Sequence, residues 1–302
     1  MPLRPPLCIG KCYSGPERGC MQAGGPRFFS RATRLRRALL GFLLAAPALL
    51  AASTPVLAAD CSATSASPVA LDSVPDARTI VLADGRRIAL AGVGSFALLV
   101  DRPADADRAE LKELRALVAA GSLRLVLLTQ RLDRRGRFPA LIFQGDRLVQ
   151  ADLAGAGVAL MLPGRTENPC LATILAAEEQ ARTHRRGYWT DPATVPLAAR
   201  PDVLSHRIGG FAMMEGKVLS ANERRTRTYL NFGRKWSEDV TVEIAAVDRS
   251  RFTGDLAPSS LVGHRVRVRG FLAEHGGPMM ELTSPAQLQR LPESVSPATD
   301  RP

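Results

Sequence analysis

Histidine and cysteine are scarce in this chain of 302 residues, and their scarcity limits the kinds of site it can hold. The four histidines are scattered, and none has the spacing typical of metal ligands; they are His184, His206, His264 and His275. Three of the five cysteines precede residue 21, so few remain for a disulfide framework. Nothing in the sequence indicates a haem, nucleotide or flavin cofactor, and we expect none.

Positive charge dominates the whole chain, with a net charge of +11, but most of this excess lies at the amino terminus. Without residues 1–58, 32 basic and 28 acidic residues remain, a net charge of +4. Most of the excess is therefore typical of a targeting segment rather than of nucleic-acid binding along the whole chain.

Residues 31–58 have the three parts of a secretory signal: a basic segment, an apolar segment and small residues at Val56-Leu57-Ala58. We expect cleavage near Ala58 and a periplasmic or secreted protein. An uncleaved membrane anchor is the alternative, because residues 38–59 are nearly long enough to span a bilayer. Residues 1–20 lack periodicity, and a start at Met21 would leave them untranslated.

Cys61 and Cys170 are the cysteines left in the expected mature chain. Two cysteines in an exported chain suggest one disulfide, which would tie the amino terminus to the region before a late helix. Two free thiols are the alternative.

Short strands with turns between them open the region 69–192. Apolar alternation predicts strands over 69–74, 79–83 and 87–90, with Asp84-Gly85 as a hairpin turn. Further strands are expected over 123–130 and 138–144, and helices over 106–121, 148–160 and 171–187. This order predicts a mainly β fold with α (α+β), in which a five-stranded barrel carries three packed helices.

Three stretches of this region resemble a known family: ARTIVLADGRRIALAGV, LDRRGRFPALIFQGDRLVQADLAGAGVALM and ILAAEEQARTHRRGYWTD. They include an Asp-x-x-Gly-Arg turn at 133–137 and an Arg-Gly-x-Trp at 186–189. Their order resembles that of the staphylococcal nuclease, or thermonuclease-like, family. The resemblance implies an OB-like barrel and a calcium-assisted phosphodiesterase with acidic metal ligands, a general-base glutamate and two phosphate-binding arginines.

Most of the family's catalytic positions are changed in this sequence. Metal positions hold Arg78, Gly94 and Ser95, and the positions of one arginine and of the glutamate hold Ala89 and Ala97. Arg137 alone keeps a catalytic position of the family. We therefore expect a degenerate hydrolytic site without a metal, and Ca²⁺ only if the chain is still a nuclease.

Two alternatives stay open in this region. Four acidic residues could supply a rearranged metal site, or they could form a solvated helix start; they are Asp101, Asp105, Asp107 and Glu110. Arg137 could bind phosphate together with Arg134 and Arg135, or it could tie strands together through carbonyl groups.

Residues 205–292 predict about five more strands and a second small barrel. The run GKVLSA…RTYLNFG…LVGHRVRVRGFLAEHGGPMMELTSPAQLQRL resembles an OB-fold nucleic-acid-binding module. This segment contains thirteen Lys/Arg and nine Asp/Glu, so it holds the whole surplus of the mature chain. OB-folds bind single strands through basic grooves and stacking aromatic rings.

Two groups of arginines are the candidates for nucleic-acid contacts in this second region. Arg265, Arg267 and Arg269 alternate with valines, and Arg224, Arg225 and Arg227 lie near a hairpin tip. The alternative for the first group is a solvated edge paired with glutamates. Three aromatic residues could stack on bases or fill the barrel core: Tyr229, Phe232 and Trp236.

The expected organisation is a leader (1–58), an amino-terminal segment (59–68), a thermonuclease-like domain (69–192), a linker (193–204), an OB-like domain (205–292) and a disordered tail (293–302). The leading hypothesis is an exported binding protein whose ligand is DNA, RNA or another anionic polymer. An active metal-dependent nuclease and an envelope protein-interaction module are the alternatives. Membrane contact is expected only through the signal segment.

Overall fold

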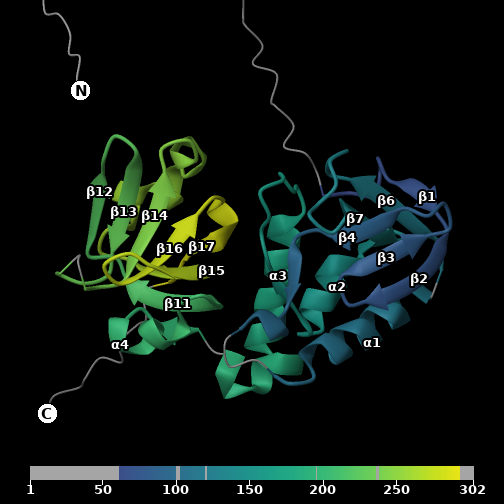
Figure 1. Ribbon diagram of the computed structural model, residues 1–302, viewed down its shortest axis with the longest axis horizontal. Helices are drawn as coiled ribbons and strands as arrows, with labels where there is room; N and C mark the ends of the chain where they lie inside the picture. The colour runs from purple at the N-terminus through teal and green to yellow at the C-terminus, as the bar shows by residue number, and fades with distance from the viewer. Residues whose placement is uncertain (1–60, 100–102, 120, 195, 236–237, 293–302) are drawn as a thin grey trace, which may run out of the picture. The chain divides into compact units, whose positions relative to one another are not determined.

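A computed structural model describes residues 61–99, 103–119, 121–194, 196–235 and 238–292. The expected leader and tail lie outside these residues, as does the expected cleavage site. Over the described residues the protein is mainly β with four α-helices, and its longer strands form two curled sheets (Figure 1). This confirms the expected α+β class. Both sheets belong to the same compact unit of the chain.

The first sheet has the strand order β1-β6-β7-β4-β3-β2, with β8 paired to β7. Strands β4 and β7 run parallel, and the other neighbours run antiparallel. The consecutive strands β1 and β2 lie at opposite ends of this order, so the sheet curls back on itself. The bounds are β1 Ser67–Val69, β2 Leu71–Asp76, β3 Thr79–Leu82, β4 Arg87–Leu90, β6 Leu123–Leu127, β7 Phe138–Gln144 and β8 Arg147–Leu148.

The hairpin predicted at Asp84-Gly85 joins β3 to β4 as expected. Gly85 has a φ of +84°, a conformation that glycine adopts without strain. The Asp84 carboxylate accepts hydrogen bonds from the backbone N–H and the guanidinium of Arg86, which fixes the turn.

Three helices pack on this sheet: α1 Ala106–Ala119, α2 Val149–Gly155 and α3 Leu171–Thr183. Helix α1 lies against β2, and α2 lies against β7 and α3 (Figure 1). Leu114 and Val118 of α1 are buried, as the apolar stripe at helical spacing predicts.

The helix predicted over 148–160 is too long. Helix α2 ends at Gly155, and Ala159–Met161 form a short strand, β9, that pairs with β5 (Val93–Ser95). The chain turns at Gly157, where φ is +73° and a Cβ would lie 2.2 Å from the carbonyl oxygen of Arg186. Only glycine fits this approach between two backbones, so the apolar run after it continues as a buried strand.

The second sheet has the order β10-β11-β15-β16-β14-β13-β12, with β17 on β15. It repeats the scheme of the first sheet. The consecutive strands β11 and β12 lie far apart in the order, and β14 and β16 run parallel. The bounds are β10 Leu197–Ala198, β11 Phe211–Lys217, β12 Ser220–Glu223, β13 Arg227–Asn231, β14 Thr241–Ala245, β15 Arg265–Glu274, β16 Pro278–Leu282 and β17 Leu288–Arg290.

The segment expected to be a linker contributes to this second sheet. Strand β10 pairs in parallel with β11, and the short helix α4 (Pro201–Leu204) follows it. Leu204 is fully buried in the core of the second sheet, so its side chain anchors the end of the segment.

A disulfide joins Cys61 to Cys170, with a Cα–Cα distance of 4.7 Å, and confirms the expected pairing. Cys170 immediately precedes α3 and is fully buried, so the bond ties the start of the described chain to the core of the first sheet.

A smaller apolar cluster joins β11 of the second sheet to helical segments of the first region. Phe96 packs against Trp189 with ring centroids 5.3 Å apart, and the same cluster contains Phe211 and Met213 of β11. Leu99 forms a β-bridge with Phe211. Apolar burial therefore contributes to the contact between β11 and the helical segments of the first region. None of the described helices is long and apolar enough to cross a membrane.

Candidate functional site

Several positions at which the nuclease family has catalytic residues lie at the end of β4 and along β5. Apolar packing fills this region. A Cβ added at Gly94 would come within 2.8 Å of the side chains of Leu98 and Leu162. An aspartate at this position therefore has no room without rearrangement. Ser95 is fully buried, and its hydroxyl accepts a hydrogen bond from the N–H of Ala97 at 3.1 Å.

The guanidinium of Arg137 is engaged within the first sheet. It donates to Asp133 Oδ2 at 2.9 Å, to Thr79 Oγ1 at 2.9 Å and to the carbonyl oxygen of Arg78 at 3.3 Å. Its side chain is only 11% exposed. These contacts agree with the interpretation that the arginine ties the 133–137 turn to β3.

We predict that R137A lowers the free energy of unfolding by about 1–3 kcal/mol, because a buried hydroxyl and a carbonyl lose a charged donor. Chemical denaturation of the variant and of the parent protein measures this difference. R134A is the matched control, since Arg134 is exposed on the same turn and makes no side-chain hydrogen bond or ion pair with the described residues. Equal stability of R137A and R134A would contradict the structural role.

The acidic residues of the first region do not come together as a metal site. Asp105 accepts a hydrogen bond from the Tyr188 hydroxyl at 2.9 Å, and Asp101 lies outside the described residues. Among the residues described, no group of three or more His, Cys, Asp or Glu is placed to hold a metal ion. The residues present therefore do not fit the Ca²⁺ site that the resemblance implies.

Glu110 of α1 is fully buried beside the replaced family positions. Burial raises the pKa of its carboxyl to about 7, and the charge of Arg78 and the Ser95 hydroxyl offset this effect only in part. Neither carboxylate oxygen has a partner with hydrogen-bond geometry among the described residues. A side chain that solvent does not reach cannot act as a base on a substrate in solution.

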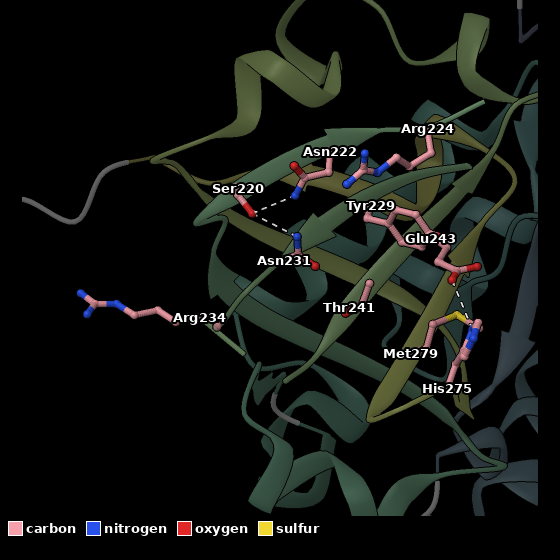
Figure 2. A pocket seen from close by; sticks show the side chains of 11 residues that line it. Ser220, Asn222, Arg224, Tyr229, Asn231, Arg234, Thr241, Glu243, His275 and Met279 are labelled. Carbon is pink, nitrogen blue, oxygen red and sulfur yellow. Dashed lines mark hydrogen bonds and ion pairs between the residues drawn. The ribbon is translucent and has the colours of Figure 1, made fainter. Parts of the chain in front are cut away.

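The second sheet carries a groove of about 500 Å³ (Figure 2). It lies over β12, β13, β14 and the start of β16, and includes a residue of the turn between β15 and β16. We call it the β12–β16 groove. Its lining residues are Ser220, Asn222, Arg224, Tyr229, Asn231, Gly233, Arg234, Thr241, Glu243, His275 and Met279.

Hydrogen bonds hold the polar side chains of the β12–β16 groove in place. The amides of Asn222 and Asn231 donate to the Ser220 hydroxyl at 3.3 and 3.0 Å (Figure 2). Cross-strand pairing places Asn222 opposite Tyr229, so the phenol ring lies beside an amide group that has further hydrogen-bonding capacity.

Arg224 lies at the turn between β12 and β13, which Arg249 braces. The guanidinium of Arg249 donates to the Arg224 carbonyl at 2.6 Å and to Glu223 at 2.7 Å. Arg224 is exposed, and its side chain points over the sheet in Figure 2, whereas Arg234 extends away from the opposite end of the groove. The groove therefore has one basic side chain at each end.

Glu243 forms part of the groove floor and is only 2% exposed. Its carboxylate pairs with Arg227 at 2.9 Å and lies 3.4 Å from His275. Arg227 is thereby occupied in an ion pair, whereas its neighbour Arg225 is exposed and does not line the groove. Of the three arginines predicted near this hairpin tip, only Arg224 faces the groove.

The exposed basic row predicted at β15 is wrong for Arg267 and Arg269, which are 4% and 1% exposed. Arg267 pairs with Glu179 at 2.9 Å and Glu215 at 2.7 Å, and Arg269 pairs with Glu178 at 2.7 Å. Both side chains lie against α3, so they are not available to phosphate. The half-exposed Arg265 pairs with Glu215 at 3.2 Å.

The three aromatic candidates have different positions. Tyr229 lines the β12–β16 groove, and Phe232 packs against the core of the second sheet, where a Cβ at Gly216 would touch its ring. Trp236 lies outside the described residues.

Sequence reasoning missed most of the polar residues of the groove. Thr241 and Glu243 are two residues apart in the run DVTVEIA, a spacing that places both side chains on the same face of a strand. His275 follows β15 at the next turn, and nothing local relates it to β14. Comparison of the chain with protein-family models and with curated proteins finds no match.

Proposed function

We propose that the protein binds single-stranded nucleic acid, or another anionic polymer with comparable chemistry, in the β12–β16 groove. The observation that carries this proposal is the combination in one groove of the Tyr229 ring, two asparagine amides and arginines at both ends. An aromatic face stacks on any base, and arginines neutralise the flanking phosphates.

We infer that both sheets are OB-like barrels. In the first sheet β1 and β2 correspond to the two halves of the first OB strand: β2 pairs with β3, β1 pairs with β6, and β4 runs parallel to β7. In the second sheet β12 and β11 correspond to these halves: β12 pairs with β13, β11 pairs with β15, and β14 runs parallel to β16. In this scheme the β12–β16 groove lies over strands two and three, the face on which OB-folds bind oligonucleotides. Fold similarity alone does not establish a ligand, so the groove's side chains carry the proposal.

The proposed activity is binding without hydrolysis. In the first region, the buried Ser95, the apolar packing around Gly94 and the engaged guanidinium of Arg137 argue against metal-assisted cleavage. In this account an exported, thermonuclease-like protein has a degenerate first site and binds its polymer through the second sheet.

A titration with a labelled single-stranded oligonucleotide tests the groove. We expect Y229A to weaken binding about tenfold, since stacking on one aromatic ring contributes about 1–3 kcal/mol, whereas Y229F should keep most of the affinity. R224Q should weaken binding and lower the salt dependence by about one phosphate contact.

R225Q is the matched control for R224Q, because both arginines are exposed on the same turn but only Arg224 lines the groove. Equal losses of affinity in R224Q and R225Q would indicate that the oligonucleotide is attracted to the positive charge of the turn and not bound in the groove. Unchanged binding in Y229A would remove the stacking role.

A further inference from the structure

The turn at residues 131–135 is a basic surface that the proposed groove does not use. Arg131, Arg134 and Arg135 are exposed, and none of their side chains makes a hydrogen bond or ion pair with another described residue. Many other arginines of the second sheet and of α3 do make ion pairs, such as Arg182, Arg249 and Arg267. Three unpaired guanidinium groups within five residues therefore form a concentrated positive surface.

The same turn exposes a large aliphatic side chain. Leu132 is 55% exposed, and it lies between Arg131 and Asp133. An exposed leucine alone is unremarkable, but here it lies in the same five-residue segment as three unpaired arginines.

Hydrogen bonds hold the backbone of residues 133–137, the part of this segment that carries Arg134 and Arg135. Asp133 accepts hydrogen bonds from the N–H groups of Arg135 and Arg137 at 2.8 and 2.9 Å, and its N–H donates to the Arg137 carbonyl at 2.8 Å. Gly136 has a φ of +69°, which closes the turn. Asp133 is thus engaged with Arg137 and does not neutralise the three exposed arginines.

We propose that the 131–135 turn docks on an anionic lipid surface, with Leu132 inserted among the acyl chains and the three arginines on the headgroup phosphates. An aliphatic side chain gains free energy in the acyl region, and basic residues near an anionic bilayer are attracted to it. Leu132 has no ring to stack on a base, so the tip suits a bilayer better than a nucleic-acid strand. This contact is independent of the signal segment and of the β12–β16 groove.

A tryptophan introduced at residue 132 reports insertion through the emission that it adds to that of Trp189 and Trp236 in the parent protein. In the full chain we expect the indole of the L132W variant to shift to shorter emission wavelengths with vesicles of phosphatidylcholine and phosphatidylglycerol. Lipids brominated on the acyl chain should quench it, and vesicles of phosphatidylcholine alone should have little effect. Replacing Arg131, Arg134 and Arg135 by glutamine should weaken the partitioning about fivefold for each arginine.

The L219W variant is the matched control, because Leu219 is a leucine of similar exposure, 45%, that lies between β11 and β12. It also controls for binding through the leader, which both variants carry. Equal quenching of the two variants, or quenching in phosphatidylcholine alone, would overturn the proposal. A response of L132W to a single-stranded oligonucleotide but not to vesicles would assign the turn to nucleic acid instead. If L132W does not fold, flotation of the parent protein and of L132S with the same vesicles tests the proposal. Equal flotation of the two proteins would overturn it.

Discussion

R269A is expected to lower the free energy of unfolding by about 3–5 kcal/mol, the largest effect that we predict for a single substitution. Arg269 and Glu178 are each 1% exposed, and their side chains join β15 to α3 through contacts of 2.7 and 2.8 Å. Removing the arginine leaves the Glu178 carboxylate buried without its countercharge, and the carbonyl of Met161 loses a donor at 3.1 Å. Urea unfolding of the full chain measures the loss.

R265A is the control for Arg269, because Arg265 lies on the same strand with a side chain 46% exposed and pairs with Glu215. A half-exposed ion pair of this kind contributes about 1 kcal/mol or less. The double variant R269M/E178L should recover most of the loss, since an apolar pair of similar volume avoids burying a charge. If R269A costs no more than R265A, the buried pair does not hold β15 against α3 as we describe.

The second large effect is a pH dependence that arises from Glu110. Its folded-state pKa of about 7 lies above the ordinary value of 4.5 because the side chain is buried. A group with a raised pKa contributes its full stability below pH 4.5, and this stability is lost as the pH rises through 7. From pH 5 to pH 8 the loss amounts to about 2–3 kcal/mol.

E110Q removes this titration while keeping the shape of the side chain. The difference in stability between the variant and the parent protein should therefore shift by about 2–3 kcal/mol in favour of the variant between pH 5 and pH 8. Comparing the two proteins at both pH values cancels the contributions of all other titrating groups. E113Q is the control, since Glu113 lies on the same helix and is not buried. A constant difference for E110Q would mean that Glu110 is solvated in the folded protein.

Local signals in the sequence predicted local features of the fold. The Asp84-Gly85 turn, the α1 stripe and the Cys61–Cys170 disulfide are all found where the sequence places them. Each depends on turn chemistry, helical periodicity or the number of available thiols, which a single segment or a residue count carries. The predicted length of α2 was wrong because the helix ends where Gly157 approaches Arg186, and Arg186 belongs to a distant segment of the chain.

The features of the candidate sites that could not be predicted from the sequence depend on contacts between distant segments of the chain. The run RVRVRG reads as an exposed basic row, but Glu178, which pairs with Arg269, lies 91 residues earlier in the chain. The burial of Glu110 likewise depends on how α1 packs against β5, and not on its neighbours in sequence. In the second sheet, pairing between strands brings Tyr229 and Glu243 into register, whereas His275 reaches Glu243 from a later turn.

The central claim is that the protein binds a single strand through the second sheet and does not cleave it. The most direct measurement incubates labelled single-stranded DNA and RNA with the protein in calcium, in magnesium and in chelator, and reads mobility and fragment size on one gel. We predict a salt-sensitive shift without cleavage in all three conditions, and a weaker shift for Y229A. Metal-dependent cleavage would contradict the degenerate first site, and the absence of any shift would contradict the groove as a nucleic-acid site.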